Sequence, residues 1–84
     1  MKTETIRTQL VEIIAEEAQL ETVEVKETKT FDGLIDSLTL IVIVADIENN
    51  FGIKIPADYI GQLTNLESAV ALVSSLIRVK PSIA

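Results

Sequence analysis

The chain has no histidine and no cysteine, and its 84 residues include no tryptophan, one tyrosine and two phenylalanines. Without cysteine it can build neither a disulfide framework nor a thiolate metal site, and without histidine only carboxylate sites for hard cations remain. A serine nucleophile would also lack the base that usually activates it. The sequence therefore predicts a protein that is not an enzyme and holds no metal ion. Because hydrophobic residues still make up 48% of the chain, the core is expected to be aliphatic.

Basic residues and long apolar runs are scarce as well. Seven Lys and Arg against thirteen Asp and Glu give a net charge of −6, which repels both nucleic-acid phosphates and anionic lipid surfaces. The longest apolar run, residues 40–45, is far too short to span a bilayer, and the first residues lack the apolar core of a signal peptide. We expect a single domain over residues 1–84, monomeric and cytoplasmic, with no nucleic-acid partner and no membrane insertion.

The two ends of the chain carry helical patterns. Residues 4–18 predict an amphipathic helix with an apolar stripe of Ile6, Leu10, Ile13 and Ile14. Near the other end, Thr64 and Glu67 have the spacing of a capping box. They open a second helical stripe that can continue until Pro81, formed by Leu66, Ala69, Val70, Val73, Leu76 and Ile77. Before it, Pro56 is expected to start a short helical turn that Gly61 ends.

Residues 19–35 show no such periodicity. The polar stretch 24–30 predicts a long surface loop, anchored by Val23, Val25 and Phe31. Loops of this length in a compact domain often have a function.

The middle segment is ambiguous on local grounds, because residues 40–44 are rich in β-branched side chains and could form a buried strand. Its length favours a helix over residues 37–50 instead, with Gly52 as the C-terminal signal. One face of this helix suits the core and consists of Leu40, Ile43, Val44, Ile47 and Phe51. With the other elements it predicts an all-α fold, a small four-helix bundle with three main helices, one short helix and a long first loop.

The opposite face of the same helix is also apolar and consists of Leu38, Ile41, Val42 and Ala45. A bundle this small cannot easily surround a helix, so we expect this face to be exposed and to act as a docking surface. Two alternatives remain open at this point. The first loop could fold over the face, or two copies of the chain could associate through it.

Asp36 and Ser37 stand where this helix is expected to begin. Aspartate and serine are common there simply because they cap helices. The second interpretation is that Ser37 is a covalent attachment point, since a helix N-terminus accepts a phosphate-linked group. Another protein would then add that group.

Several motifs together favour the second interpretation. They are Asp36-Ser37-Leu38, the apolar helix that ends in residues 47–52, the Ile-Lys-Ile-Pro stretch at 53–56, and the helix opened by Thr64-Asn65-Leu66. In this combination the chain resembles the acyl carrier proteins, most strongly over residues 32–70. The resemblance implies a four-helix bundle in which Ser37 carries 4′-phosphopantetheine, transferred from coenzyme A by a phosphopantetheinyl transferase. It also implies that acyl groups are held on this arm as thioesters.

The resemblance further implies that acyl-loading, condensing or transferring enzymes recognise the second helix. The residues in question are Asp36, Leu38, Ile41, Val42, Ala45 and Glu48. We therefore expect a freestanding acyl carrier protein of fatty acid, polyketide or specialised lipid synthesis. Because Gly33 lies three residues before Asp36, as in some D-alanyl carriers, an aminoacyl, peptidyl or D-alanyl carrier is the first alternative. The second is an unmodified helical adaptor in which Ser37 is only a cap.

Overall fold

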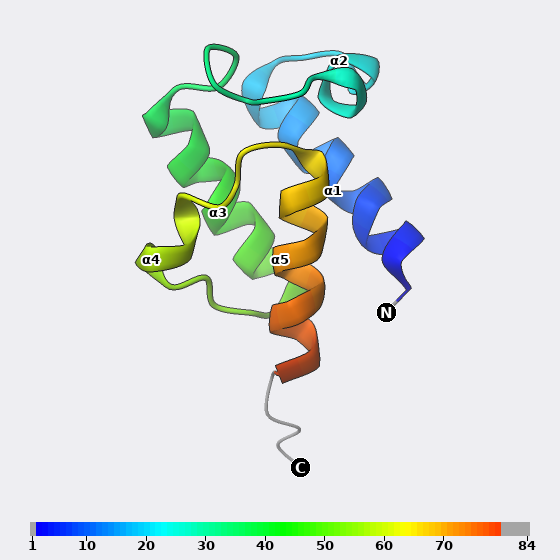
Figure 1. Ribbon diagram of the computed structural model, residues 1–84, viewed down its shortest axis with the longest axis vertical. Coiled ribbons are helices and arrows are strands. Elements are labelled where there is room, and N and C mark those ends of the chain that lie inside the picture. The colour runs from blue at the N-terminus through cyan, green and yellow to red at the C-terminus, as the bar shows by residue number, and fades with distance from the viewer. Residues whose placement is uncertain (1, 80–84) are drawn as a thin grey trace.

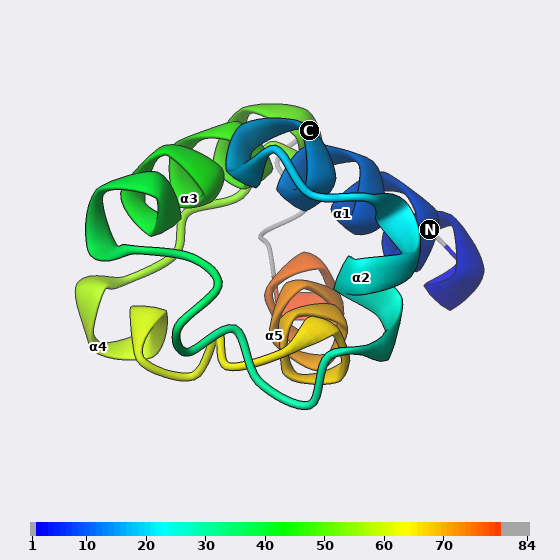
Figure 2. The same cartoon turned by 90° about the horizontal axis from the view of Figure 1, so that it is seen from above.

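Five helices make up the fold in the computed structural model, which describes residues 2–79. They are α1 (Thr3–Ala18), α2 (Thr22–Glu27), α3 (Ser37–Phe51), α4 (Ala57–Ile60) and α5 (Leu66–Val79). The three long helices lie side by side, with α1 antiparallel to α3 and α5 (Figure 1). Seen from above, these three helices surround a common interior, and α4 lies on the side of the bundle opposite α1 (Figure 2). The predicted all-α class is confirmed, and the strand alternative for residues 40–44 is wrong.

The core is aliphatic, as the composition predicts. Its largest fully buried side chains come from α1, α2, α3 and α5 and are Ile6, Leu10, Ile14, Val25, Ile43, Ile47 and Val73. Burying one such side chain is worth about 1.5–3 kcal/mol, so this cluster is the main stabilising feature. On its outside, the Arg7 guanidinium forms an ion pair with Glu67, which joins α1 to α5.

The predicted first loop contains a helix that the sequence pattern did not indicate. In α2, Glu21 and Glu24 form a capping box, and the Glu21 N–H donates to the Glu24 carboxylate at 3.0 Å. The helix has six residues and buries only Val25, so no apolar repeat is visible in its sequence. Val25 and Phe31 are anchors as predicted, but Val23 is 51% exposed and anchors nothing.

Helix α3 matches its predicted span to within one residue. It begins at Ser37 with Asp36 as the N-cap and ends at Phe51. The C-cap is Gly52, whose φ of 65° is the left-handed conformation that glycine tolerates best. The predicted inner face is buried at Ile43, Val44, Ile47 and Phe51, while Leu40 is half-buried against the core.

Helix α5 begins one residue later than the capping-box spacing predicts. Asn65, not Thr64, caps it: the Ser68 N–H donates to Asn65 Oδ1 at 2.8 Å, and the Asn65 N–H donates to Ser68 Oγ at 3.0 Å. The prediction that Pro81 ends this helix concerns a residue outside the described part of the chain. Of the helices described, none is both long and apolar enough to cross a membrane.

Candidate functional site

Ser37 occupies the first position of α3 and is exposed to solvent. The preceding Asp36 caps the helix, because the Thr39 N–H donates to its Oδ1 at 2.8 Å. The hydrogen bonds from Thr39 hold the pKa of Asp36 below its ordinary value, so this carboxylate is charged at neutral pH. The result is an accessible hydroxyl beside a fixed acid at a helix N-terminus.

The segment that leads into Ser37 is held from both sides. The Phe31 N–H donates to the Thr64 carbonyl at 2.7 Å, and the Asn65 side-chain amide donates to the Lys29 carbonyl at 3.1 Å. A tight turn follows, in which the Leu34 and Ile35 N–H groups donate to the Phe31 carbonyl. These contacts tie the start of α3 to the start of α5, so Ser37 is placed by rigid elements of the bundle.

The local electrostatics favour an anionic group on Ser37. The first turn of α3 contains no acidic residue, and the unpaired N–H groups of a first turn attract negative charge by about 0.3–1 kcal/mol at an exposed site. Asp36 already accepts from Thr39. Its negative charge also repels a phosphate on the neighbouring serine. Asp36 is therefore suited to fix the helix start and to face a partner, not to hold such a group.

The outer face of α3 is exposed along its apolar stripe. Leu38 is 78% exposed, Ile41 58% and Val42 45%, and Ala45 is exposed as well. The predicted exposure is confirmed, and the described part of the first loop does not cover the face. Single exposed aliphatic residues are ordinary, whereas a contiguous row of them on one helix is less common on a monomer's surface.

Glu48 lies differently from what its predicted role requires. It is half-buried, and the Ile55 N–H donates to its Oε2 at 2.7 Å. Its carboxylate thus faces the segment between α3 and α4, where Ile53 and Ile55 are buried. One sequence signal for this contact is an acid in the last turn of a helix whose next segment returns to the core, but no spacing rule identifies the partner.

The other acid of α3, Asp46, faces α1. The Asp46 carboxylate close by raises the pKa of Glu17. Both residues are half-buried.

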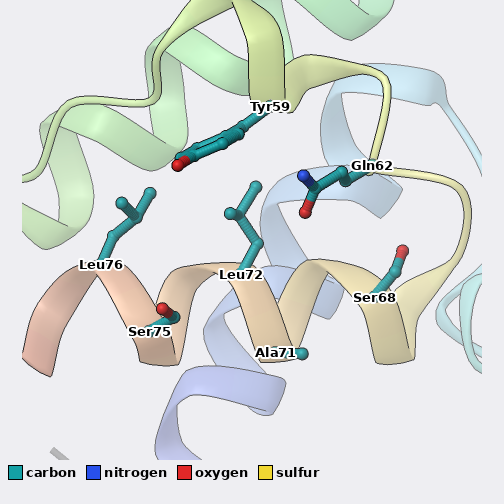
Figure 3. Close-up of a pocket in the computed structure, with 7 residues that line it drawn as sticks. All are labelled: Tyr59, Gln62, Ser68, Ala71, Leu72, Ser75 and Leu76. Atoms are coloured by element: carbon teal, nitrogen blue, oxygen red, sulfur yellow. The ribbon is translucent and has the colours of Figure 1, made fainter.

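A groove of about 470 Å³ lies between α4 and α5, and its lining mixes polar and apolar side chains. The ring of Tyr59 lies across it and faces Leu72 and Leu76 (Figure 3). The hydroxyls of Ser68 and Ser75 line it without a carboxylate or other base, so it offers no catalytic pair. Tyr59 is 40% exposed, so its ring covers part of the groove and faces solvent as well. Within residues 2–79, no group of three or more acidic side chains is arranged to hold a metal ion.

Known proteins resemble the chain over most of its length. A family model described as "Phosphopantetheine attachment site" matches residues 8–73, a range that includes Ser37. An acyl carrier protein of Myxococcus xanthus is 43% identical over 63 residues, which are 73% of this chain and 80% of that protein. One from Micrococcus luteus is 43% identical over 63 residues, covering 73% and 78%. One from Acidothermus cellulolyticus is 38% identical over 74 residues, covering 86% and 88%.

Proposed function

The chain belongs to the acyl carrier protein family, and from that membership we propose that the hydroxyl of Ser37 is its attachment point for 4′-phosphopantetheine. Acyl carrier proteins are carriers that catalyse nothing themselves, so the prediction that this protein is not an enzyme is confirmed. The predicted phosphopantetheine cofactor is confirmed as well. The assignment to Ser37 is supported chiefly by its geometry: an exposed hydroxyl at the first position of α3, directly after the capping Asp36.

The chain itself contributes only the serine hydroxyl and its position to the modification. Ser37 Oγ forms a bond to the phosphorus that bears the pantetheine of coenzyme A, the bond from that phosphorus to the 3′,5′-ADP part breaks, and the serine proton leaves. Since the chain has no histidine or cysteine, the base for this proton belongs to the phosphopantetheinyl transferase. Asp36 keeps the helix start, and hence Ser37, in a fixed position.

The residues around Ser37 fit the charge of the group. The new phosphodiester lies at the N-terminus of a 15-residue helix whose first turn has no acid, and this favours an anion. When bound, the group supplies a flexible arm with a terminal thiol that carries acyl groups as thioesters. A hollow in the core, lined by apolar residues such as Ile43 and Ile47, has a volume of about 10 Å³. An attached acyl chain therefore stays outside the bundle in this conformation, since such a volume barely admits one water.

The exposed face of α3 is proposed as the surface on which partners dock, with Asp36, Leu38, Ile41, Val42 and Ala45 as its members. It begins beside Ser37, so a partner that binds there has the arm within reach. The partners are the phosphopantetheinyl transferase and enzymes that load, condense or transfer acyl groups. We expect the carrier to act as a monomer in fatty acid, polyketide or specialised lipid synthesis.

Two other functions were predicted from the sequence. A carrier of amino acids or of D-alanine has the same fold and arm, and loading assays with adenylating enzymes separate it from an acyl carrier. Family membership speaks against the unmodified adaptor.

Intact mass spectrometry tests the assignment of Ser37. The purified chain is incubated with coenzyme A and a broad-specificity phosphopantetheinyl transferase, and one added phosphopantetheine is expected. Ser37→Ala should abolish the gain, while Ser68→Ala, which removes a hydroxyl of α5, should leave it unchanged. Modification that survives in Ser37→Ala would refute the assignment.

A further inference from the structure

We propose that partners recognise α3 through an aliphatic recess and not through a basic surface, and that Glu48 is a positioning residue that holds the segment after α3. This inference rests on the proposed function, because it concerns the surface beside Ser37. It specifies the chemistry of the partner, which the fold alone leaves open.

The first argument is the composition of the exposed face. Leu38 and Ile41 are more than half exposed, Val42 and Ala45 continue the row, and Asn49 extends it without charge. From Ser37 to Phe51 the helix has no basic residue and only two acids. A partner surface of Lys and Arg would therefore have to desolvate its charges against aliphatic groups, which is unfavourable. An aliphatic recess would bury the same row favourably.

The second argument is that neither acid of α3 is fully exposed. The Glu48 carboxylate accepts from the Ile55 N–H at 2.7 Å, and Asp46 lies close enough to Glu17 of α1 to raise the pKa of Glu17. Both are half-buried at the edges of the exposed row. Asp36, at the end beside Ser37, is an exposed carboxylate next to this face that can meet a basic group of a partner.

The third argument is where the negative charge lies instead. Exposed acids are concentrated on α1 and around α2, at Glu4, Glu12, Glu16, Glu21, Glu24 and Glu27. The chain as a whole is strongly acidic, yet α3 itself has no fully exposed acid, and the exposed acids that precede it in sequence are Asp32 and Asp36. This distribution suits an apolar partner surface on the exposed face of α3, while the negative charge elsewhere keeps the protein soluble.

Glu48 has a positioning role that follows from its contact. The bond to Ile55 fixes the segment between α3 and α4, where Ile53 and Ile55 are buried. It therefore orients the last turn of α3, which carries the far end of the docking face. Glutamine keeps an acceptor oxygen at this position while removing the charge, so Glu48→Gln separates the two roles.

The experiment measures binding, which does not require modification. Calorimetry measures the Kd between the Ser37→Ala chain and the phosphopantetheinyl transferase from the same organism. The NaCl concentration is raised from about 50 to 500 mM, so that exposed charge pairs become largely screened. We expect Kd to change less than about threefold. Ile41→Asp, introduced into Ser37→Ala, should raise Kd about tenfold or more at both ends of this range. Ile41→Ser should raise it less, because it removes apolar surface without adding a charge.

Two further variants make the test specific. Glu48→Gln should bind like its parent, and so should Glu12→Gln, which removes the same charge from an exposed site on α1. Circular dichroism and sedimentation are measured for each variant, so a loss of binding that is caused by unfolding is recognised. If Ile41→Asp unfolds, the binding of Ile41→Ser is used in its place.

The outcomes that overturn the inference are distinct. A Kd that weakens tenfold with salt, tighter binding by Ile41→Asp, or weaker binding by Glu48→Gln would show that charge governs docking. A dimer that Ile41→Asp dissociates, with transferase binding unchanged, would assign the face to a second copy of the chain. If the transferase binds as expected but Ser37 stays unmodified in the wild type, the proposed function fails and the docking chemistry stands.

Discussion

Helices α1 and α3 build the same core and meet solvent in opposite ways. Each buries an aliphatic stripe, with Leu10 and Ile14 on α1 and Ile43 and Ile47 on α3. The outer side of α1 carries exposed acids such as Glu12, whereas the outer side of α3 carries exposed aliphatic residues such as Ile41. An outer face that serves only solubility is polar. Helix α3 is therefore apolar toward solvent as well as toward the core, which is the property that the proposed docking face requires.

The two faces of α3 should respond very differently to the same substitution. Ile43 is 2% exposed and Ile41 58%, so Ile43→Ala leaves a cavity in the core while Ile41→Ala does not. We expect Ile43→Ala to lower the free energy of unfolding by about 2–5 kcal/mol. Ile41→Ala should change it by no more than about 0.5 kcal/mol. Urea unfolding followed by circular dichroism measures both.

This pair tests the comparison directly. Similar losses in the two variants would mean that Ile41 is covered in solution, by the first connection or by a second copy of the chain. A small loss at Ile43 would mean that the interior is looser than its burial indicates.

The acids of the two helices also differ in their contacts: Glu48 of α3 accepts a backbone hydrogen bond, whereas Glu12 of α1 is exposed. Glu48→Ala leaves the N–H of the buried Ile55 without its acceptor, which should cost about 1–3 kcal/mol. Glu48→Gln keeps an acceptor and should cost less. Glu12→Ala, on the exposed side of α1, should change stability by about 0.5 kcal/mol at most.

Amide hydrogen exchange gives the local readout for Glu48. The Ile55 amide should exchange slowly in the wild type and in Glu48→Gln and faster in Glu48→Ala, while amides in the middle of α1 keep their protection. Equal protection of Ile55 in all three proteins would show that this hydrogen bond is not formed in solution.

The long helices could be predicted from the sequence because their periodicity is strong. The predicted inner face of α3 is confirmed from Ile43 to Phe51, and so is the predicted exposure of Leu38 and Ile41. This exposure is predictable because a chain of 84 residues cannot easily surround a helix on every side. The position of Ser37 at the helix start followed from the preceding aspartate and is confirmed.

The failures share one cause, which is that they depend on single contacts and not on a repeat. Helix α2 has one buried residue, Val25, and is opened by glutamates where the usual capping signal has Ser or Thr. The cap of α5 shifted from Thr64 to Asn65 because Ser68 provides the reciprocal hydrogen bond. The contact of Glu48 with Ile55 joins residues seven apart across a bend, which no helical spacing predicts.

The starts of α1 and α3 provide the last and smallest contrast. Lys2 at the start of α1 makes no side-chain cap, whereas Asp36 accepts from Thr39. These hydrogen bonds lower the pKa of Asp36 in the folded chain. Its contribution to stability is therefore complete above the ordinary aspartate pKa and is lost as the pH falls through the lowered value. Glu17 acts in the opposite sense, because its raised pKa favours the folded state as the pH falls.

Comparison of Tm against pH for the wild type and Asp36→Asn isolates the cap, since both proteins keep Glu17. Asparagine also caps helices but does not titrate in this range. We expect the two Tm curves to lie close together near neutral pH, and that of the wild type to fall below that of Asp36→Asn as the pH drops through the acid range. Glu17→Gln should leave this difference unchanged. Curves that stay parallel down to the acid limb would mean that the Asp36 carboxylate does not cap α3, and Ser37 would then stand at a helix start fixed only by the bonds of Phe31 and Asn65.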